Sequence, residues 1–171
     1  MKAHNRGFTL VELMVALAVS GFLMAGISYV YIAIKQSVDT SKELENAQEV
    51  LRYSSEVFTR SLKQTADFPV IPNISTLVVQ QTTLGSTACD GNKPGVPFSE
   101  TFTLDDSQLL CQVNAGPTQV LLTGINDINY RLNGDLVEVT VIPENLNVEM
   151  LANGFRIDVA LSGKIMAEAL R

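Results

Sequence analysis

Hydrophobic residues gather in one uninterrupted run near the N-terminus. From Leu13 to Ile34 the chain has 22 consecutive residues without a charged side chain. As an α-helix rising 1.5 Å per residue, this run would be about 33 Å long, enough to cross the roughly 30 Å hydrocarbon core of a bilayer. Lys2 and Arg6 precede it, so the positive-inside rule keeps the start of the chain cytoplasmic and exports the remainder.

A cleaved secretory signal is the alternative interpretation of this run. Such a signal has an apolar region of about 7–15 residues followed by a cleavage site of small residues. Here the run is longer, and the segment from Lys35 to Asp39 that follows it contains no convincing site. We therefore interpret the run as a retained membrane-spanning segment.

A helical pattern continues beyond the apolar run. Apolar or small residues recur every three or four positions, while charged residues mostly fall on other faces. Together the two patterns predict one helix from about Phe8 to about Thr65, roughly 87 Å long. The segment Asp67-Phe68-Pro69 and Pro72 are expected to end it. The stripe consists of Leu44, Ala47, Val50, Leu51, Ser54, Val57, Phe58 and Leu62.

After Pro72 the sequence changes to short β-rich runs separated by turn residues. Asn133-Gly134, between two such runs, is the strongest short hairpin signal, and Asp105-Asp106-Ser107 predicts a second turn. The predicted fold class is α+β, with the long N-terminal helix packed on a small antiparallel β-sheet head. The predicted strands are Ser75–Thr82, Thr101–Leu104, Gln108–Val113, Thr118–Thr123, Ile128–Leu132, Asp135–Ile142 and Phe155–Ser162.

One residue does not fit an ordinary membrane anchor. Glu12 lies at the start of the apolar run, within Gly7-Phe8-Thr9-Leu10-Val11-Glu12-Leu13. A carboxylate at membrane depth is costly unless it finds a partner. Glu12 either reaches the interface from the helix end or awaits a positive charge from another molecule.

A short basic leader ending in glycine, then Phe-Thr-Leu-Val-Glu and an apolar helix, closely resembles the type IV pilin signature. The resemblance implies that a membrane-bound prepilin peptidase cuts after Gly7 on the cytoplasmic side and methylates the new N-terminus, Phe8. It also implies that Glu12 neutralises the terminal amine of a neighbouring subunit during assembly. A subunit out of register would leave both charges unpaired, so we expect the pair to set register more than to add net stability.

The membrane helix departs from some major pilins in one respect, because no proline lies between Leu13 and Ile34. The roles of Gly21 and Gly26 have two interpretations. Either the two glycines loosen the helix locally, or they let a neighbouring helix pack closely; we favour the packing role.

A weaker resemblance concerns the subfamily. The amphipathic segment Leu44–Leu62 and the later segment Leu122–Arg131 look like the PilW/PulJ branch, which includes minor pilins of type IV pili and the J-type minor pseudopilin of type II secretion. The expected function is a minor type IV pilin that helps prime or cap the pilus. The alternatives are a J-type minor pseudopilin and a membrane-tethered binding or adhesive head.

This resemblance also implies partners and a domain organisation. The expected partners are prepilin peptidase, other minor and major pilins (or pseudopilins) and the bacterial inner membrane, across which the C-terminal head is periplasmic before assembly. The expected parts are a prepilin leader (1–7), a transmembrane and assembly helix (8–35), an amphipathic half of the long helix (36–66) and a β-rich periplasmic head (67–171).

The chain has two cysteines, Cys89 and Cys111. Because both lie in the exported part, an oxidising compartment favours one disulfide between them, and two buried free thiols are the alternative. Closing a loop of this size is expected to stabilise the head by roughly 3 kcal/mol. Many pilins instead have a cysteine pair near the C-terminus, which this chain lacks.

Charge and composition argue against several other functions. The chain has 18 acidic and 12 basic residues, and removal of Lys2 and Arg6 leaves 10 basic residues and a net charge of −8, which opposes attraction to nucleic acid. The only histidine, His4, lies in the leader, so the processed chain cannot form a Ser-His-Asp or Cys-His site. We therefore assign no catalytic residue, cofactor or metal site.

Three acidic segments offer the oxygen donors that calcium prefers. They are Asp90-Gly91-Asn92, Asp105-Asp106 and Asn126-Asp127. Each is also ordinary turn chemistry, and none matches an EF-hand loop, so we favour turns.

Overall fold

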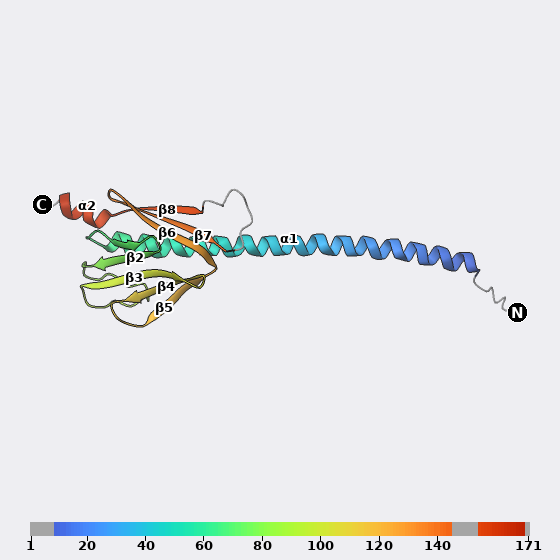
Figure 1. The fold of residues 1–171 in the computed structure, drawn as a ribbon, viewed down its shortest axis with the longest axis horizontal. Helices are drawn as coiled ribbons and strands as arrows, with labels where there is room; N and C mark the ends of the chain where they lie inside the picture. The colour runs from blue at the N-terminus through green and yellow to red at the C-terminus, as the bar shows by residue number, and fades with distance from the viewer. Residues whose placement is uncertain (1–8, 145–153, 170–171) are drawn as a thin grey trace. The chain divides into compact units, whose positions relative to one another are not determined.

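The longest element of the computed structural model, which describes residues 9–144 and 154–169, is helix α1 (Figure 1). It runs without a break over 55 residues, close to the predicted range, although Phe8 lies outside the described residues. The elements follow in the order α1 (Leu10–Gln64), β1 (Val70–Asn73), β2 (Thr76–Gln81), β3 (Phe98–Asp105), β4 (Gln108–Val113), β5 (Thr118–Thr123), β6 (Ile125–Asn133), β7 (Leu136–Pro143), β8 (Phe155–Ala160) and α2 (Ser162–Ala169).

Backbone packing divides the chain into two units, residues 1–42 and 43–171. The described part of the first unit is almost entirely helix, and all its side chains are exposed. The second unit contains the remainder of α1, all eight strands and α2. Leu44 belongs to the predicted apolar stripe but is 50% exposed. The buried part of α1 begins only at Ala47, almost a full turn later.

The first five strands form one antiparallel sheet in chain order, β1-β2-β3-β4-β5. The predicted turn at Asp105-Asp106-Ser107 joins β3 to β4, and Asp105 pairs with Gln108. Asp106 and Ser107 have positive φ values of 44° and 61°, as both central residues of a type I′ hairpin require. The predictions for β4 and β5 match in both bounds.

The last three strands form a second antiparallel sheet, β6-β7-β8, where the sequence predicted a single one. The chain passes from β5 to β6 through Gly124, whose φ of +84° favours glycine. Further along β6, the Tyr130 N–H donates to the Ile74 carbonyl at 2.8 Å, which ties β6 to the turn between β1 and β2. The turn of the β6–β7 hairpin is Gly134-Asp135, because Asn133 pairs with Leu136, one residue later than predicted.

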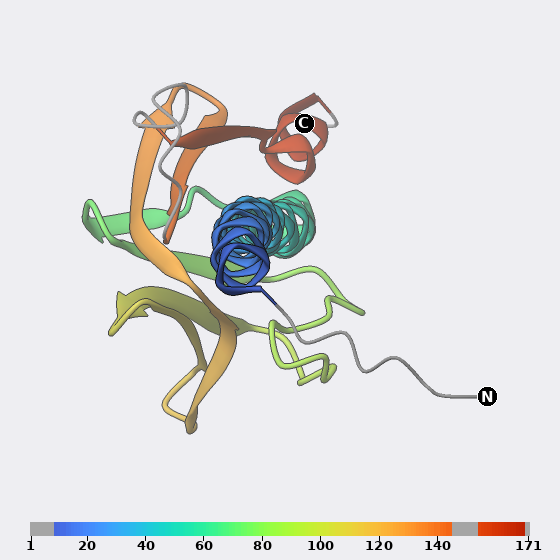
Figure 2. The ribbon, with the colours of Figure 1, turned by 90° about the vertical axis from the view of Figure 1, so that its right-hand side faces the viewer.

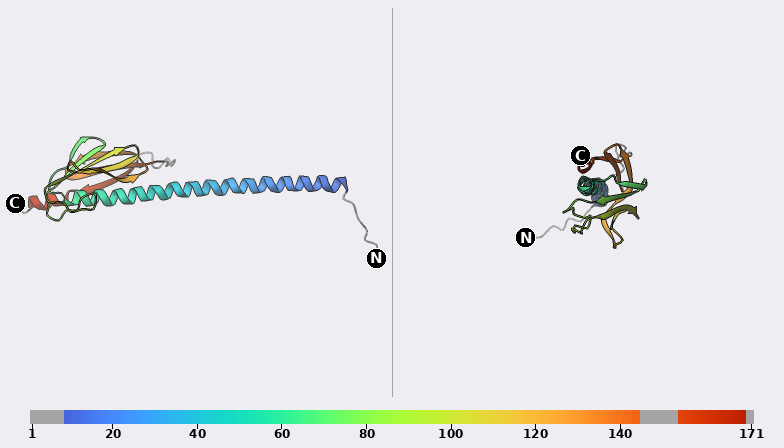
Figure 3. Two further views of the ribbon diagram at one scale, coloured as in Figure 1. Left: turned by 90° about the horizontal axis from the view of Figure 1, so that it is seen from below. Right: turned by 90° about the vertical axis from the view of Figure 1, so that its left-hand side faces the viewer.

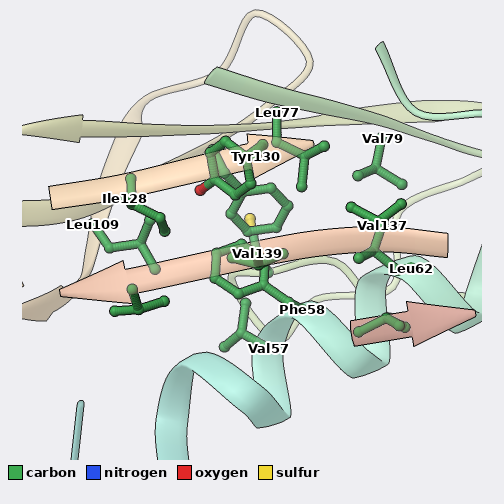
Figure 4. Close-up of a cluster of buried hydrophobic side chains, with 14 of the residues drawn as sticks. Val57, Phe58, Leu62, Leu77, Val79, Leu109, Ile128, Tyr130, Val137 and Val139 are labelled. Carbon is green, nitrogen blue, oxygen red and sulfur yellow. The ribbon is translucent and has the colours of Figure 1, made fainter. Parts of the chain in front are cut away.

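Within the second unit, both sheets lie on one flank of α1 when viewed along the helix (Figure 2), and Figure 3 shows the same flank from two further directions. Phe58 of α1 is fully buried. Its ring makes edge contacts with Phe102 at 5.4 Å and with Tyr130 at 5.6 Å between centroids, and Figure 4 shows Phe58 and Tyr130 in the cluster. One core therefore joins α1 to both sheets.

A buried polar cluster lies in the interface between α1 and the first sheet. The Ser61 hydroxyl donates to Glu100 Oε2 at 2.6 Å, and the Gln81 amide donates to the same oxygen at 2.8 Å. Gln81 also donates to the Ser61 carbonyl at 2.9 Å. Because a buried polar group is costly without partners, this cluster favours one register of helix on sheet.

Two elements were not predicted. Strand β1 contains Pro72, and its pairing with β2 is irregular, so proline lies on an edge strand, where a missing N–H is tolerated. Helix α2 begins at Ser162, which the sequence assigned to the last strand. A Cβ at Gly163 would overlap the Thr65 carbonyl oxygen, so the start of α2 lies directly against the segment that follows α1.

Candidate assembly site at the start of helix α1

Thr9 and Glu12 form a reciprocal cap at the start of α1. The Thr9 N–H and hydroxyl both donate to Glu12 Oε2 at 3.0 Å, and the Glu12 N–H donates to Thr9 Oγ1 at 3.3 Å. This geometry is a capping box, in which the first residue and the third helical residue satisfy each other's backbone donors. Thr9-x-x-Glu12 is the sequence signature of this motif, so the spacing of these two residues could have predicted the cap.

The carboxylate of Glu12 has no basic partner in residues 9–144 and 154–169. The ion pairs there involve Arg52 and Arg156, both in the second unit. The capping bonds use Oε2 alone. A positive group that neutralises Glu12 must therefore come from outside this part of the chain, which leaves open the predicted pairing with a neighbour's terminal amine.

Helix α1 is long and apolar enough to cross a membrane. Its most apolar 18-residue window has a mean hydropathy of 2.2 and no buried residue. Large apolar side chains on the surface of this helix are exposed, among them Phe22 at 82% and Tyr29 at 77%. Soluble proteins rarely expose apolar surface on this scale, so lipid or other protein is needed to cover it.

Four glycine and phenylalanine positions in or before α1 were also singled out from the sequence, and the structure describes only two of them. Gly7 and Phe8 lie outside the described residues. Gly21 and Gly26 lie inside the unbroken helix, and a Cβ at either would have no atom within 4 Å. Neither glycine is therefore required by a contact within the described chain, and their predicted packing against a neighbouring helix stays a prediction.

The predicted disulfide between Cys89 and Cys111 is present, with the two Cα atoms 6.5 Å apart, so the alternative of two free thiols is wrong. Cys89 is 7% exposed and Cys111 is 1% exposed, and both belong to the main core cluster. The disulfide joins the segment between β2 and β3 to strand β4.

Two of the three acidic segments considered for calcium, those at Asp90 and Asp127, use their carboxylate oxygens in local hydrogen bonds. Asp90 accepts from the Asn92 N–H at 2.9 Å and from its side-chain amide at 2.8 Å. Asp127 accepts from the Ile128 N–H and from the Asn129 amide, both at 2.9 Å. Such bonds are the ordinary chemistry of Asx turns. Within the described residues, no group of three or more His, Cys, Asp or Glu side chains is arranged to hold a metal ion.

Charged pairs on the surface of the second unit shift the pKa values of Glu49, Arg52 and Arg156. A hydrogen bond from Arg52 at 2.8 Å lowers the pKa of Glu49. A hydrogen bond to Asp158 at 2.8 Å raises the pKa of Arg156. Both pairs are exposed, where such contacts contribute little to stability, so neither indicates a reactive site.

Comparison with protein families places a known motif on this segment. Residues 2–28 match the family model of the prokaryotic N-terminal methylation motif. Comparisons with curated proteins and with solved structures found no match. The motif covers Gly7, Phe8 and Glu12, and it implies processing by a prepilin peptidase and assembly with other pilins. The N-terminal segment of this chain therefore carries the type IV pilin-like prepilin signature.

Proposed function

We propose that this chain is a minor type IV pilin subunit that helps prime or cap the pilus. In this proposal prepilin peptidase removes residues 1–7 and methylates Phe8, and the processed helix anchors the subunit in the inner membrane with its head in the periplasm. The subunit then leaves the bilayer and joins other pilins. The role is structural and requires no reaction catalysed by this chain.

The observation that carries the proposal is the position of Glu12. Its carboxylate lies at the start of an exposed apolar helix, inside the matched motif, and no basic group of the described residues pairs with it. A terminal amine brought by a neighbouring subunit satisfies this carboxylate in a medium of low dielectric constant, where opposite charges attract strongly. The capping box engages Oε2 of this carboxylate but gives it no counter-charge.

A second observation supports the export of the head. The Cys89–Cys111 disulfide is part of the main core, and disulfides form and persist in oxidising compartments such as the bacterial periplasm.

The assignment as a minor subunit rests on the sequence. The apolar helix has no proline, the last 60 residues have no cysteine, and the Leu44–Leu62 and Leu122–Arg131 segments resemble the PilW/PulJ branch. A J-type pseudopilin of type II secretion shares these features, so the experiment has to separate the two systems.

Mass spectrometry of the mature N-terminus tests the processing step. The expected chain lacks its first seven residues and begins with N-methylated Phe8. Retention of the leader, or cleavage at another position, would contradict the proposal and favour a simple membrane tether.

Incorporation of a Glu12→Gln variant into sheared filaments tests the assembly step. We expect the variant to be processed and to remain in the membrane at the wild-type level, but to be depleted from filaments. Normal incorporation of Glu12→Gln contradicts the proposed role of the carboxylate. Deletion of the gene then separates the two systems, because a pilin mutant loses pili whereas a pseudopilin mutant loses protein secretion.

A further inference from the structure

The two sheets of the second unit differ in charge. Strands β1–β5 of the first sheet contain only two charged residues, Glu100 and Asp105. Glu100 is fully buried on the inner face, where it accepts from the Ser61 hydroxyl, and Asp105 lies at the end of β3, beside the hairpin turn. The outer face of the first sheet therefore carries no charge except at this one end.

The second sheet has the charged outer face that is usual for a solvated surface. Its register places Arg131 opposite Glu138, and Glu138 opposite Asp158. Arg156 makes ion pairs with Glu138 at 4.0 Å and with Asp158 at 2.8 Å. The lack of charge on the first sheet is therefore a local property of that face and does not follow from the composition of the head.

The middle of the uncharged face is a patch of valine, leucine and threonine. Val78 lies between the core residues Leu77 and Val79, so its side chain points outward, because side chains alternate along a strand. Residues paired across neighbouring strands share a face, and the register extends the patch over all five strands. The patch consists of Val70, Val78, Thr101, Thr103, Leu110 and Val120.

Both ends of the patch are open, and its surroundings are polar but neutral. Val70 on β1 is 57% exposed, and Val120 on β5 is 54% exposed. The register places Gln80 opposite Ser99, and Gln112 opposite a residue of the patch. Depletion of charged residues is the composition that distinguishes the core of a protein–protein interface from the rest of a protein surface.

The chemistry and shape of this face select its partner. Nucleic acids and phosphate groups require basic side chains, and strands β1–β5 have none. A flat sheet is matched by a second flat sheet packed about 10 Å away. The face measures about 20 Å in each direction, or about 400 Å² per partner. Such an area gives a weak contact, which suits a subunit that its helix already holds in a filament.

The charge of the chain also favours this face for contact between subunits. The processed chain has a net charge of −8, so subunits of similar charge repel each other at their charged faces and approach most easily where charge is absent. The matched motif implies assembly with other pilins.

We propose that the outer face of the first sheet docks an uncharged sheet surface on the head of a neighbouring pilin-like subunit. The proposal rests on the proposed function for the identity of this partner. It adds a contact between heads, separate from any contact made by the membrane helices.

The test introduces one charge into the face. Thr101 lies on the central strand β3, between Val78 and Gln112. Thr101→Glu adds a charge there, and Thr101→Gln adds a side chain of the same size without the charge. Ala160→Glu places the same charge on the outer face of the second sheet, where Ala160 is exposed.

All variants are made in the full-length chain and expressed in a pilus-forming host. The measured quantity is the amount of subunit in sheared filaments divided by the amount of processed subunit in the membrane. We expect Thr101→Glu to lower this ratio about tenfold, because docking leaves the new charge buried without a partner. Thr101→Gln and Ala160→Glu should stay within about twofold of wild type.

The outcomes separate this inference from the proposed function. If Glu12→Gln is depleted but Thr101→Glu and Thr101→Gln give equal ratios, the inference is wrong and the proposed function survives. If Glu12→Gln is incorporated normally, the proposed function fails, while the two variants of Thr101 still decide whether the face is covered.

Photo-crosslinking gives a second readout that needs no added charge. A photoreactive side chain in place of Thr101 should capture a head peptide of a subunit that carries the N-terminal methylation motif, as identified by mass spectrometry. In place of Ala160 it should capture none. Equal capture from both positions, or capture at Thr101 only of proteins without the motif, overturns the inference.

Discussion

A buried polar atom without a hydrogen-bond partner lowers the free energy of unfolding, and the Tyr130 hydroxyl is such an atom. Tyr130 is 3% exposed, and its hydroxyl has no hydrogen-bond partner, although its ring packs against Phe58. Burial raises the pKa of Tyr130 above its ordinary value. The ring therefore contributes packing, while the hydroxyl is left without the bonds that water gives it in the unfolded chain.

Tyr130→Phe is expected to leave the free energy of unfolding at neutral pH unchanged or to raise it by about 1 kcal/mol, because it removes only the unpaired hydroxyl. Since the pKa is raised in the folded state, the wild type should lose stability as pH rises above about 10, where the unfolded tyrosine ionises. The variant should lose less. Urea unfolding of the full chain in detergent at pH 7 and pH 10.5 measures both effects. Tyr53→Phe, at a partly buried ring, is the control at pH 7 for the removal of a tyrosine hydroxyl.

The capping box at Thr9 has its own consequence. Thr9→Val removes the hydroxyl that accepts from the Glu12 N–H, so the first turn of α1 should open more often. We expect amide hydrogen exchange in residues 10–13 of the processed chain in micelles to become about fivefold faster. Thr9→Ser keeps the hydroxyl and should exchange like the wild type. Equal rates in the two variants would show that the cap does not hold this turn.

At the scale of elements, α2 depends on one close approach between backbones. Gly163 lies so near the Thr65 carbonyl that a Cβ at this position would overlap it. Gly95, in the segment before β3, has open space around the same position. The two glycines therefore separate the effect of crowding from the general effect of replacing glycine.

Gly163→Ala is expected to lower the free energy of unfolding by about 1–3 kcal/mol, because α2 must move away from the segment that follows α1. Gly95→Ala should be neutral or stabilising by less than about 1 kcal/mol, since it lowers only the entropy of the unfolded chain. Thermal unfolding followed by circular dichroism compares them. Similar midpoints for the two variants would mean that α2 is not held against that segment.

At the scale of the whole molecule, covalent and apolar contacts join the head into one core. The main cluster contains residues from α1 and from both sheets, and it includes both cysteines. Loss of the disulfide should thus affect the folding of the entire second unit.

The double variant Cys89→Ala/Cys111→Ala is expected to be about 3 kcal/mol less stable than the oxidised wild type, because the 22-residue separation is no longer closed in the unfolded chain. Urea unfolding gives the difference. Wild type treated with a reductant provides the control and should show a similar loss. If reduction leaves the unfolding midpoint unchanged, the disulfide does not stabilise the head.

Much of this fold could be predicted from the pattern of neighbouring residues in the sequence. The range of α1 was predicted to within two residues at its start and one at its end, because the apolar run and the amphipathic stripe share one helical period. Strands β4 and β5 and the turn at Asp106-Ser107 were also predicted. At the candidate site, Glu12 stood out because a carboxylate beside an apolar run is rare.

The parts that were missed depend on contacts between distant residues. Strand β1 exists because β2 pairs with it, and Pro72 alone argued against a strand. Helix α2 starts where Gly163 meets the segment after α1. Within the described chain, the division into two sheets falls at Gly124, and the bond between Tyr130 and Ile74 then links the two sheets. No local pattern encodes such distances.

The order and spacing of neighbouring residues were enough to predict an apolar helix of membrane length, a carboxylate at its start, a cysteine pair and a β-rich head. Three features came only from the folded chain: which oxygen of Glu12 is free, the buried cluster of Ser61, Gln81 and Glu100, and the two sheets that pack on α1 from Ala47 onward. Hydrogen bonds and packing act over a few ångströms, and residues far apart in sequence come within that distance only after folding.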